Sequence, residues 1–276
     1  MSSAAPSSRP SGARVRVHHL TQAKEHGERL VMLTAYDAFT ARILDDAGTD
    51  MLLVGDSIGN VALGHDSTIP VTLEEMLVAT RAVASATARA MVVADLPFGT
   101  YESGPQQALA SAVRLVKAGA QAVKLEGGAA REDAVRTLTQ AGIPVVGHLG
   151  FTPQSINALG GYRVQARGQQ EEDRLVADAV ALAKAGAVAL VLEMVPTPAA
   201  ARVTRSVAVP TIGIGAGPRT DGQVLVWTDM AGMSEWSPRF ARQFGQVGQA
   251  LHQAAQDYGQ AVREGSFPGP EHGFES

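Results

Sequence analysis

Cysteine is absent from this chain of 276 residues, and aromatic residues make up only 5% of it. Without cysteine there is no disulfide, no thiolate ligand for zinc or an iron–sulfur cluster, and no cysteine nucleophile. The absence fits a reducing compartment, and we expect a cytoplasmic protein. No apolar run reaches the roughly 18–20 residues of a membrane-spanning helix, so we expect no membrane partner.

An excess of basic residues is also lacking. Lys and Arg total 23 against 27 Asp and Glu, which gives a formal net charge of −4. A nucleic-acid-binding surface needs a clustered basic excess, so we expect no nucleic-acid partner. Residues 1–16 are rich in Ser, Pro, Ala and Arg but lack the apolar core of a signal peptide. We interpret them as a disordered N-terminal tail, with a transit peptide as the alternative.

A repeated unit organises the rest of the chain. A helix end, an Ala-Gly stop, a short apolar run and an acid follow one another three times, at residues 44–56, 115–126 and 182–193. The glycine suits a helix C-cap, which needs a left-handed residue. A run that is apolar on both faces is typical of a buried parallel strand. The repeat therefore places an acid at the carboxyl end of several strands.

Five more apolar runs resemble these strands, at residues 31–35, 91–94, 144–147, 210–214 and 224–227. Ala-rich helical stretches separate most of them, at 74–88, 105–118, 131–141 and 173–185. Eight such units in this length predict an α/β fold, a single-domain closed (β/α)₈ TIM barrel. About ten residues separate the last two strands, too few for a crossover helix, so we expect a single turn or 3₁₀ piece there. Residues 238–258 predict a closing helix, which gives a barrel domain at 17–264 and a C-terminal tail at 265–276.

Active sites of such barrels gather at the carboxyl ends of the strands. The polar residues expected there are Thr34, Asp37, Asp56, Ser57, Asp95, Lys124, Glu126, His148 and Glu193. Several converging carboxylates, without cysteine and with little histidine, favour a hard cation such as Mg²⁺ or Mn²⁺. Such an ion would relieve the repulsion among the acids and could stabilise the enolate of an α-keto acid. Glu193, far along the chain, would then be free to act as a general base.

Plainer interpretations stay open at several of these positions. A lone Asp after a strand often caps the next helix, which applies to Asp56, and Asp95 could belong to a turn. His148 could equally be a satisfied core histidine. A buried Lys is costly without a partner, which favours a functional role for Lys124. The glycine-rich run at 213–217 does not match a dinucleotide-binding motif, and it either holds a phosphate or allows close packing.

Longer strings carry a resemblance to a known family: LTAYDAFTARI, LLVGDSIGN, GHDSTIPVT, ADLPFGTY, AVKLEGG, LVLEMVP and IGIGAGPRTDGQVLV. Over residues 20–258 the chain resembles the 3-methyl-2-oxobutanoate (ketopantoate) hydroxymethyltransferases. The resemblance implies a (β/α)₈ barrel and a Mg²⁺-dependent transfer of a hydroxymethyl group to 3-methyl-2-oxobutanoate, which gives 2-dehydropantoate for pantothenate biosynthesis. The co-substrate it implies is 5,10-methylenetetrahydrofolate. It also implies a homo-oligomer, often a decamer.

The resemblance assigns roles to the strand-end residues one by one. Asp56 and Asp95 match metal ligands, and Glu126 matches a residue that completes the coordination of the metal, directly or through water. Positions that bind the keto acid are matched by Asp56, Ser57, Asp95, Lys124 and His148. Glu193 matches the proposed catalytic base. Residues 226–239 are the least family-like segment, with Thr228 where a His often stands, which puts the folate side of the site in doubt.

Two other classes are compatible with a barrel of this kind. Enzymes of the phosphoenolpyruvate mutase and isocitrate lyase group also hold Mg²⁺ and an α-keto acid, but many carry a Cys on a catalytic loop, and this chain has none. A degenerate barrel acting as a binding or scaffold protein predicts that the acids are lost. All four, Asp56, Asp95, Glu126 and Glu193, are present.

Overall fold

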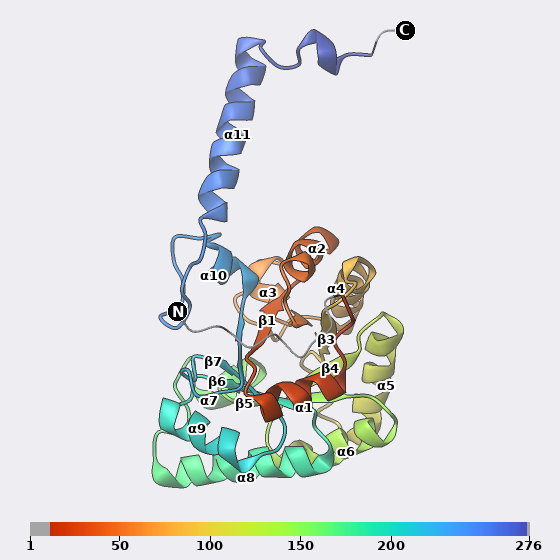
Figure 1. Ribbon diagram of the computed structural model, residues 1–276, viewed down its shortest axis with the longest axis vertical. Coiled ribbons are helices and arrows are strands. Elements are labelled where there is room, and N and C mark those ends of the chain that lie inside the picture. Colours follow the sequence, from red (N-terminus) through yellow and green to blue (C-terminus); the bar gives the residue numbers. More distant parts are fainter. Residues whose placement is uncertain (1–11, 275–276) are drawn as a thin grey trace. The chain divides into compact units, whose positions relative to one another are not determined.

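The structure is a computed structural model that describes residues 12–274 (Figure 1). The chain forms two compact units, the first ending at Val226 and the second beginning at Trp227. Most of the predicted N-terminal tail, residues 1–11, lies outside the described residues, as do residues 275–276.

The first unit is a closed barrel of parallel strands that follow one another in chain order. Its strands are β1 (Leu30–Thr34), β2 (Met51–Val54), β3 (Met91–Asp95), β4 (Ala122–Glu126), β5 (Val145–Gly150), β6 (Ala189–Glu193), β7 (Thr211–Ile214) and β8 (Gly222–Leu225). Pairing of β8 with β1 closes the barrel, and this confirms the predicted (β/α)₈ TIM barrel. Strands β2, β3, β4 and β7 are buried at every residue, and their sequences are apolar except for Asp95 at the end of β3, Lys124 and Glu126 in β4, and Thr211 at the start of β7.

Helices connect the strands of the first unit. The longer ones are α2 (Ala38–Asp46), α4 (Leu73–Ala86), α5 (Pro105–Lys117), α6 (Glu132–Gln140), α8 (Gln169–Ala185) and α9 (Thr197–Ser206). Local sequence sets their ends: Thr72 and Glu75 form a capping box at the start of α4, and Gly186 ends α8 with a φ of 107°. Short elements follow the strand ends, namely α3 (Ile58–Val61), η1 (Ala129–Arg131), η2 (Pro153–Ser155) and α7 (Ile156–Leu159). Residues 215–221, between β7 and β8, form bends and a turn. Of the two predicted alternatives for this connection, a turn is present and a 3₁₀ helix is not.

The amino-terminal end of the barrel is closed by apolar packing. Helix α1 (Val17–His26) places Leu20 and Ala23 in one buried cluster with inward-facing strand residues such as Met51. Val15 belongs to the same cluster, and its N–H donates to the carbonyl of Arg89 at 2.7 Å. The described end of the predicted N-terminal tail therefore packs as part of the barrel.

The second unit contains α10 (Trp227–Ala231), α11 (Val247–Glu264) and η3 (Pro270–His272). The predicted closing helix at 238–258 instead begins at Val247, because the residues before it make loop hydrogen bonds such as Phe244 N–H to Met230 O at 2.7 Å. No residue of α11 is buried. The ring of Phe267 contacts Tyr258 of α11, with 5.6 Å between the centroids, so part of the predicted C-terminal tail folds against this helix. Among residues 12–274, no helix combines the length and apolarity needed to cross a membrane.

Asp45 is a buried carboxylate that accepts hydrogen bonds from the N–H groups of Ala88, Arg89 and Ala90, at 2.7, 3.0 and 2.6 Å. We expect Asp45→Ala to lower the free energy of unfolding by about 2–4 kcal/mol, because these groups lose their acceptor. Urea unfolding followed by circular dichroism measures the change. Asp46→Ala removes an exposed carboxylate from the next position and is the matched control. An equal effect of both substitutions would contradict the prediction.

Candidate active site

Strand register brings the predicted polar residues together at the carboxyl end of the barrel. Asp95 of β3 lies beside Lys124 of β4, and Glu126 of β4 lies beside His148 of β5. Glu193 of β6 pairs with Gly150, two residues after His148. Because all strands run in parallel, these side chains collect at one end of the barrel.

An ion pair between Lys124 and Asp95 lies at the centre of the cluster. The ammonium is 2.6 Å from Asp95 Oδ1, and the two side chains are 5% and 2% exposed. Asp95 Oδ2 accepts a hydrogen bond from the N–H of Asp56 at 3.0 Å. Burial lowers the pKa of Lys124, but the nearby Asp95, Glu126 and Asp56 raise it above its ordinary value. Lys124 is therefore a charged ammonium, and its partner explains how a Lys fits inside a strand.

His148 joins two carboxylates, and it is more than a core histidine. Its Nδ1 lies 3.1 Å from Glu126 Oε1 and its Nε2 lies 3.1 Å from Glu193 Oε2. Burial and the charge of Lys124 lower its pKa, but the bonds to Glu126 and Glu193 outweigh them and raise the pKa to about 9. Near neutral pH the ring is protonated, with Nδ1 beside Glu126 and Nε2 beside Glu193, and the Lys124 ammonium lies 3.3 Å from the same Nδ1.

The cluster has more negative than positive charge. Its acids are Asp56, Asp95, Glu126 and Glu193, and its cations are Lys124 and protonated His148. When all four acids are ionised, four minus two leaves an excess of two negative charges. Without a cation, burial and then the charges of Asp95 and Glu126 raise the pKa of Asp56 to about 8, so near neutral pH this carboxyl is mostly protonated.

The residues fit a hard divalent cation by their chemistry. Asp56, Asp95 and Glu126 offer carboxylate oxygens, which Mg²⁺ and Mn²⁺ prefer, and a charge of +2 equals the excess of the cluster. Among residues 12–274, no group of three or more His, Asp or Glu side chains is already arranged as ligands around one point.

Ser57 lies beside the cluster at the start of α3. Its Oγ is 2.8 Å from the hydroxyl of Tyr36, a buried residue two positions after the end of β1. Sequence reasoning did not select Tyr36, although its place after a strand was the available signal. The strand-end pattern instead pointed to Asp37, the next residue in the chain. Asp37 is exposed and accepts the N–H of Thr40 at 2.9 Å, so it caps α2 and lies outside the site.

The backbone holds Glu193 in place. Its carbonyl accepts the N–H of Phe151 at 2.8 Å. Gly150 has a φ of 93°, and a Cβ atom there would lie 2.2 Å from the same carbonyl oxygen, so only glycine fits where β5 approaches β6. The side chain of Glu193 is 16% exposed, against 3% for His148. Of the two, Glu193 is thus the more accessible to a substrate.

Gln154 and Tyr101 are two further buried polar residues that sequence reasoning missed. Gln154 lies in η2 after β5, and its side-chain amide donates to Asp56 Oδ2 at 2.8 Å. Tyr101 lies in the connection between β3 and α5, and its hydroxyl donates to Gln154 Oε1 at 2.6 Å. Neither residue ends a strand, so the pattern that selected the acids did not reach them.

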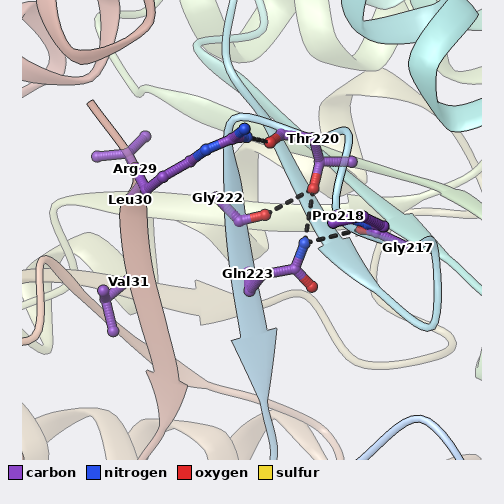
Figure 2. A pocket seen from close by; sticks show the side chains of 8 residues that line it. All are labelled: Arg29, Leu30, Val31, Gly217, Pro218, Thr220, Gly222 and Gln223. Carbon is purple, nitrogen blue, oxygen red and sulfur yellow. Dashed lines mark hydrogen bonds between the residues drawn. The ribbon is translucent and has the colours of Figure 1, made fainter. Parts of the chain in front are cut away.

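A cavity of about 560 Å³ lies away from these residues (Figure 2). It is formed at the beginnings of β1 and β8 and by the turn between β7 and β8. Gln223 crosses its wall and donates to Gly217 O at 3.0 Å and to Thr220 Oγ1 at 2.8 Å. Because it opens at the amino-terminal ends of the strands, it is not the candidate active site.

Comparison with known proteins identifies relatives along nearly the whole chain. The sequence pattern of the family described as ketopantoate hydroxymethyltransferase matches residues 14–270. The 3-methyl-2-oxobutanoate hydroxymethyltransferase of Leifsonia xyli subsp. xyli (strain CTCB07) is 56% identical over 274 residues, which are 99% of this chain and 98% of the relative. The protein of the same name from Thermobifida fusca (strain YX) is 55% identical over 95% of this chain and 94% of its own length.

Solved structures of more distant proteins share the fold. A phosphonopyruvate hydrolase crystallised with oxalate and Mg²⁺ superposes with a TM-score of 0.61 at 14% identity, over 94% of this chain and 91% of the other. A 2,3-dimethylmalate lyase, a member of the PEP mutase/isocitrate lyase superfamily, superposes with a TM-score of 0.58 at 18% identity, over 93% of this chain and 92% of the other. At these identities the likeness supports the barrel fold alone.

His148 makes the stability of the protein depend on pH. Its pKa is raised from 6.5 to about 9 in the fold, so its contribution is fully present below pH 6.5 and is lost as the pH rises through 9. In the absence of divalent cations, we expect the Tm of the wild-type protein to fall as the pH rises from 6.5 to 9. This fall should exceed the fall in His148→Gln by a few degrees, since roughly 1 kcal/mol shifts the Tm by about 2–4 °C.

Thermal unfolding followed by circular dichroism at several pH values checks this expectation. His252→Gln, at an exposed position of α11, is the control and keeps the pH dependence of the wild type. The same pH dependence in wild type and His148→Gln would rule out the charged histidine.

Proposed function

The chain belongs to the ketopantoate hydroxymethyltransferase family, and we propose that it transfers a hydroxymethyl group from 5,10-methylenetetrahydrofolate to 3-methyl-2-oxobutanoate. The product is 2-dehydropantoate, on the route to pantothenate. One observation carries the proposal beyond membership: four acids, Lys124 and His148 meet at the carboxyl end of the barrel, and two negative charges are in excess once all four acids are ionised. In a barrel that served only as a scaffold, we would not expect this cluster of buried charges, because removing charged groups from water costs free energy.

We propose that Asp56 and Asp95 hold Mg²⁺, with Glu126 completing its surround directly or through water. When bound, the ion supplies positive charge that withdraws electrons from the keto and carboxylate groups of the substrate and makes its C3 proton more acidic. The support is the match between the charge excess and a divalent ion, together with the raised pKa of Asp56, about 8. Lys124 stays with Asp95 and limits the repulsion among the carboxylates.

Lys124, Ser57 and His148 are proposed to bind the keto acid together with Asp56 and Asp95. The Lys124 ammonium and the Ser57 hydroxyl can donate hydrogen bonds to substrate oxygens at the same strand ends. Tyr36 fixes the Ser57 hydroxyl through its 2.8 Å contact, so this group is positioned before the substrate arrives. His148 orients Glu193, since its Nε2 lies 3.1 Å from that carboxylate.

Glu193 is proposed as the catalytic base. It removes the proton from C3 of the keto acid, and the electron pair of that C–H bond moves toward the keto oxygen. The C3 carbon then forms the new bond to the methylene carbon of the opened folate, and one water is consumed. The oxygen of that water becomes the hydroxyl of the product, and tetrahydrofolate leaves.

We propose further that the protein is a cytoplasmic homo-oligomer. Helix α11 supports an association surface, because Val247, Leu251, Tyr258 and Val262 are spaced by four, seven and four residues and are all exposed. This spacing places them on one face of the helix. No membrane or nucleic-acid partner is proposed.

The proposed function is tested by supplying the purified protein with Mg²⁺, 3-methyl-2-oxobutanoate and 5,10-methylenetetrahydrofolate. We expect 2-dehydropantoate, detected by mass spectrometry, to form at a rate proportional to the amount of protein. EDTA removes the ion that we propose for Asp56 and Asp95, so it should abolish the product, and added Mg²⁺ should restore it. Absence of product with the wild-type protein would overturn the proposal, whereas product in EDTA would overturn only the metal.

The role of Glu193 is tested with Glu193→Gln, which keeps the size of the side chain and removes the base. We expect kcat to fall by about 10²–10⁴-fold, the usual contribution of a general base, with little change in the keto acid affinity. Glu25→Gln, at an exposed position of α1 at the opposite end of the barrel, is the matched control. Full turnover by Glu193→Gln would refute the base assignment and leave the proposed reaction intact.

A further inference from the structure

Gln154 is a single residue that contacts two of the carboxylates proposed to surround the cation. Its backbone N–H donates to Glu126 Oε2 at 3.0 Å, and its side-chain amide donates to Asp56 Oδ2 at 2.8 Å. The same amide nitrogen donates to the carbonyl of Leu96 at 3.0 Å. Gln154 is 5% exposed, and the two carboxylate residues are each 4% exposed. It therefore ties the ends of β2, β3 and β4 to the segment that follows β5.

The orientation of this amide is determined by its neighbours. Leu96 O can only accept hydrogen bonds, so the amide nitrogen must face it, with Asp56 Oδ2 on the same side, and Oε1 must face the other way. On that side the Tyr101 hydroxyl donates to Oε1 at 2.6 Å. The Tyr101 oxygen in turn accepts the backbone N–H of Glu126 at 3.3 Å. Tyr101 thus connects the side chain that holds Asp56 to the backbone that carries Glu126.

The uncharged amide suits this position for an electrostatic reason. A Lys or Arg at 154 could also donate to Asp56, but it would add a positive charge and so reduce the negative charge available to a divalent ion. A Glu would add charge and offer no donor to Asp56. Gln holds the carboxylate by hydrogen bonding and leaves the charge of the cluster unchanged.

We propose that Gln154, oriented by Tyr101, is a positioning residue that holds Asp56 and Glu126 in the arrangement that binds the divalent cation. The inference rests on the proposed function for the identity of the site. Neither residue touches the reacting atoms. Their contribution is to keep two carboxylates from different strands at fixed places before the cation binds, which lowers the cost of ordering them at that moment.

The experiment measures binding of Mn²⁺ alone to the full-length protein by isothermal titration calorimetry at fixed pH. Gln154→Met keeps the length of the side chain and the backbone bond to Glu126 but removes the bond to Asp56. We expect its Mn²⁺ affinity to fall about 10-fold or more, the usual effect of losing a partner of a metal ligand. Gln140→Met, at an exposed position at the end of α6, is the matched control and should bind as the wild type does.

Tyr101→Phe provides a second test that does not alter Gln154 and that stands if Gln154→Met does not fold. We expect a smaller loss of Mn²⁺ affinity, about three-fold, since the amide keeps its donors but loses the group that orients it. In the Gln154→Met background, Tyr101→Phe should change the affinity less than two-fold. Equal losses in both backgrounds would show that Tyr101 acts independently and would overturn its orienting role.

A kinetic measurement separates positioning from chemistry. Gln154→Met should need at least about 10-fold more Mg²⁺ for half-maximal activity and should recover most of the wild-type kcat at saturating Mg²⁺. Wild-type Mn²⁺ affinity in Gln154→Met, or no Mn²⁺ binding by the wild type, would overturn the inference. Because the calorimetry needs no substrate, its result is independent of whether the protein makes 2-dehydropantoate.

Discussion

The ion pair between Lys124 and Asp95 is the interaction on which the rest of the site depends. Its atoms are 2.6 Å apart and both side chains are almost fully buried. One oxygen of Asp95 binds the ammonium and the other binds the N–H of Asp56, so the pair also fixes the end of β2. Removing either partner would leave a buried charge without compensation, which costs about 3–5 kcal/mol in other proteins. His148 supplies the second positive charge and distributes it over Glu126 and Glu193. With all four acids ionised the cluster keeps two uncompensated negative charges, which is the charge that the cation proposed above would balance.

The register of the barrel turns a one-dimensional pattern into this cluster. Strands β3, β4 and β5 pair so that Asp95 lies beside Lys124 and Glu126 beside His148. The same strands are apolar toward their amino-terminal ends, where α1 and Val15 complete the buried cluster. Stability is thus concentrated at one end of the barrel and polar chemistry at the other, which is how this fold tolerates a charged site without losing its core.

The sequence was sufficient for the barrel and for the acids, because buried parallel strands are continuously apolar and a charged residue that ends one is conspicuous. The strand-end pattern by itself was not sufficient to separate Asp56 from Asp37, although the family resemblance assigned a role to Asp56 alone. Both follow a strand and precede a helix, and only the fold shows that Asp37 caps α2 while Asp56 is buried beside Asp95. Gln154 and Tyr101 were missed for a related reason. Their partners are 98 and 53 positions away along the chain, and nothing in the loops that carry them indicates those contacts.

Gly150 limits how the loops after β5 and β6 can be exchanged in evolution or engineering. Loops at the carboxyl ends of barrel strands are usually regarded as independent modules that evolution or engineering can exchange one at a time. Here the loops after β5 and β6 are interlocked: no side chain fits between Gly150 and the Glu193 carbonyl, and Gln165 N–H donates to Met194 O at 2.9 Å. A new loop in either position would have to reproduce the close approach of the other. The two loops therefore constrain one another, and exchanging one of them would require a matching change in the other.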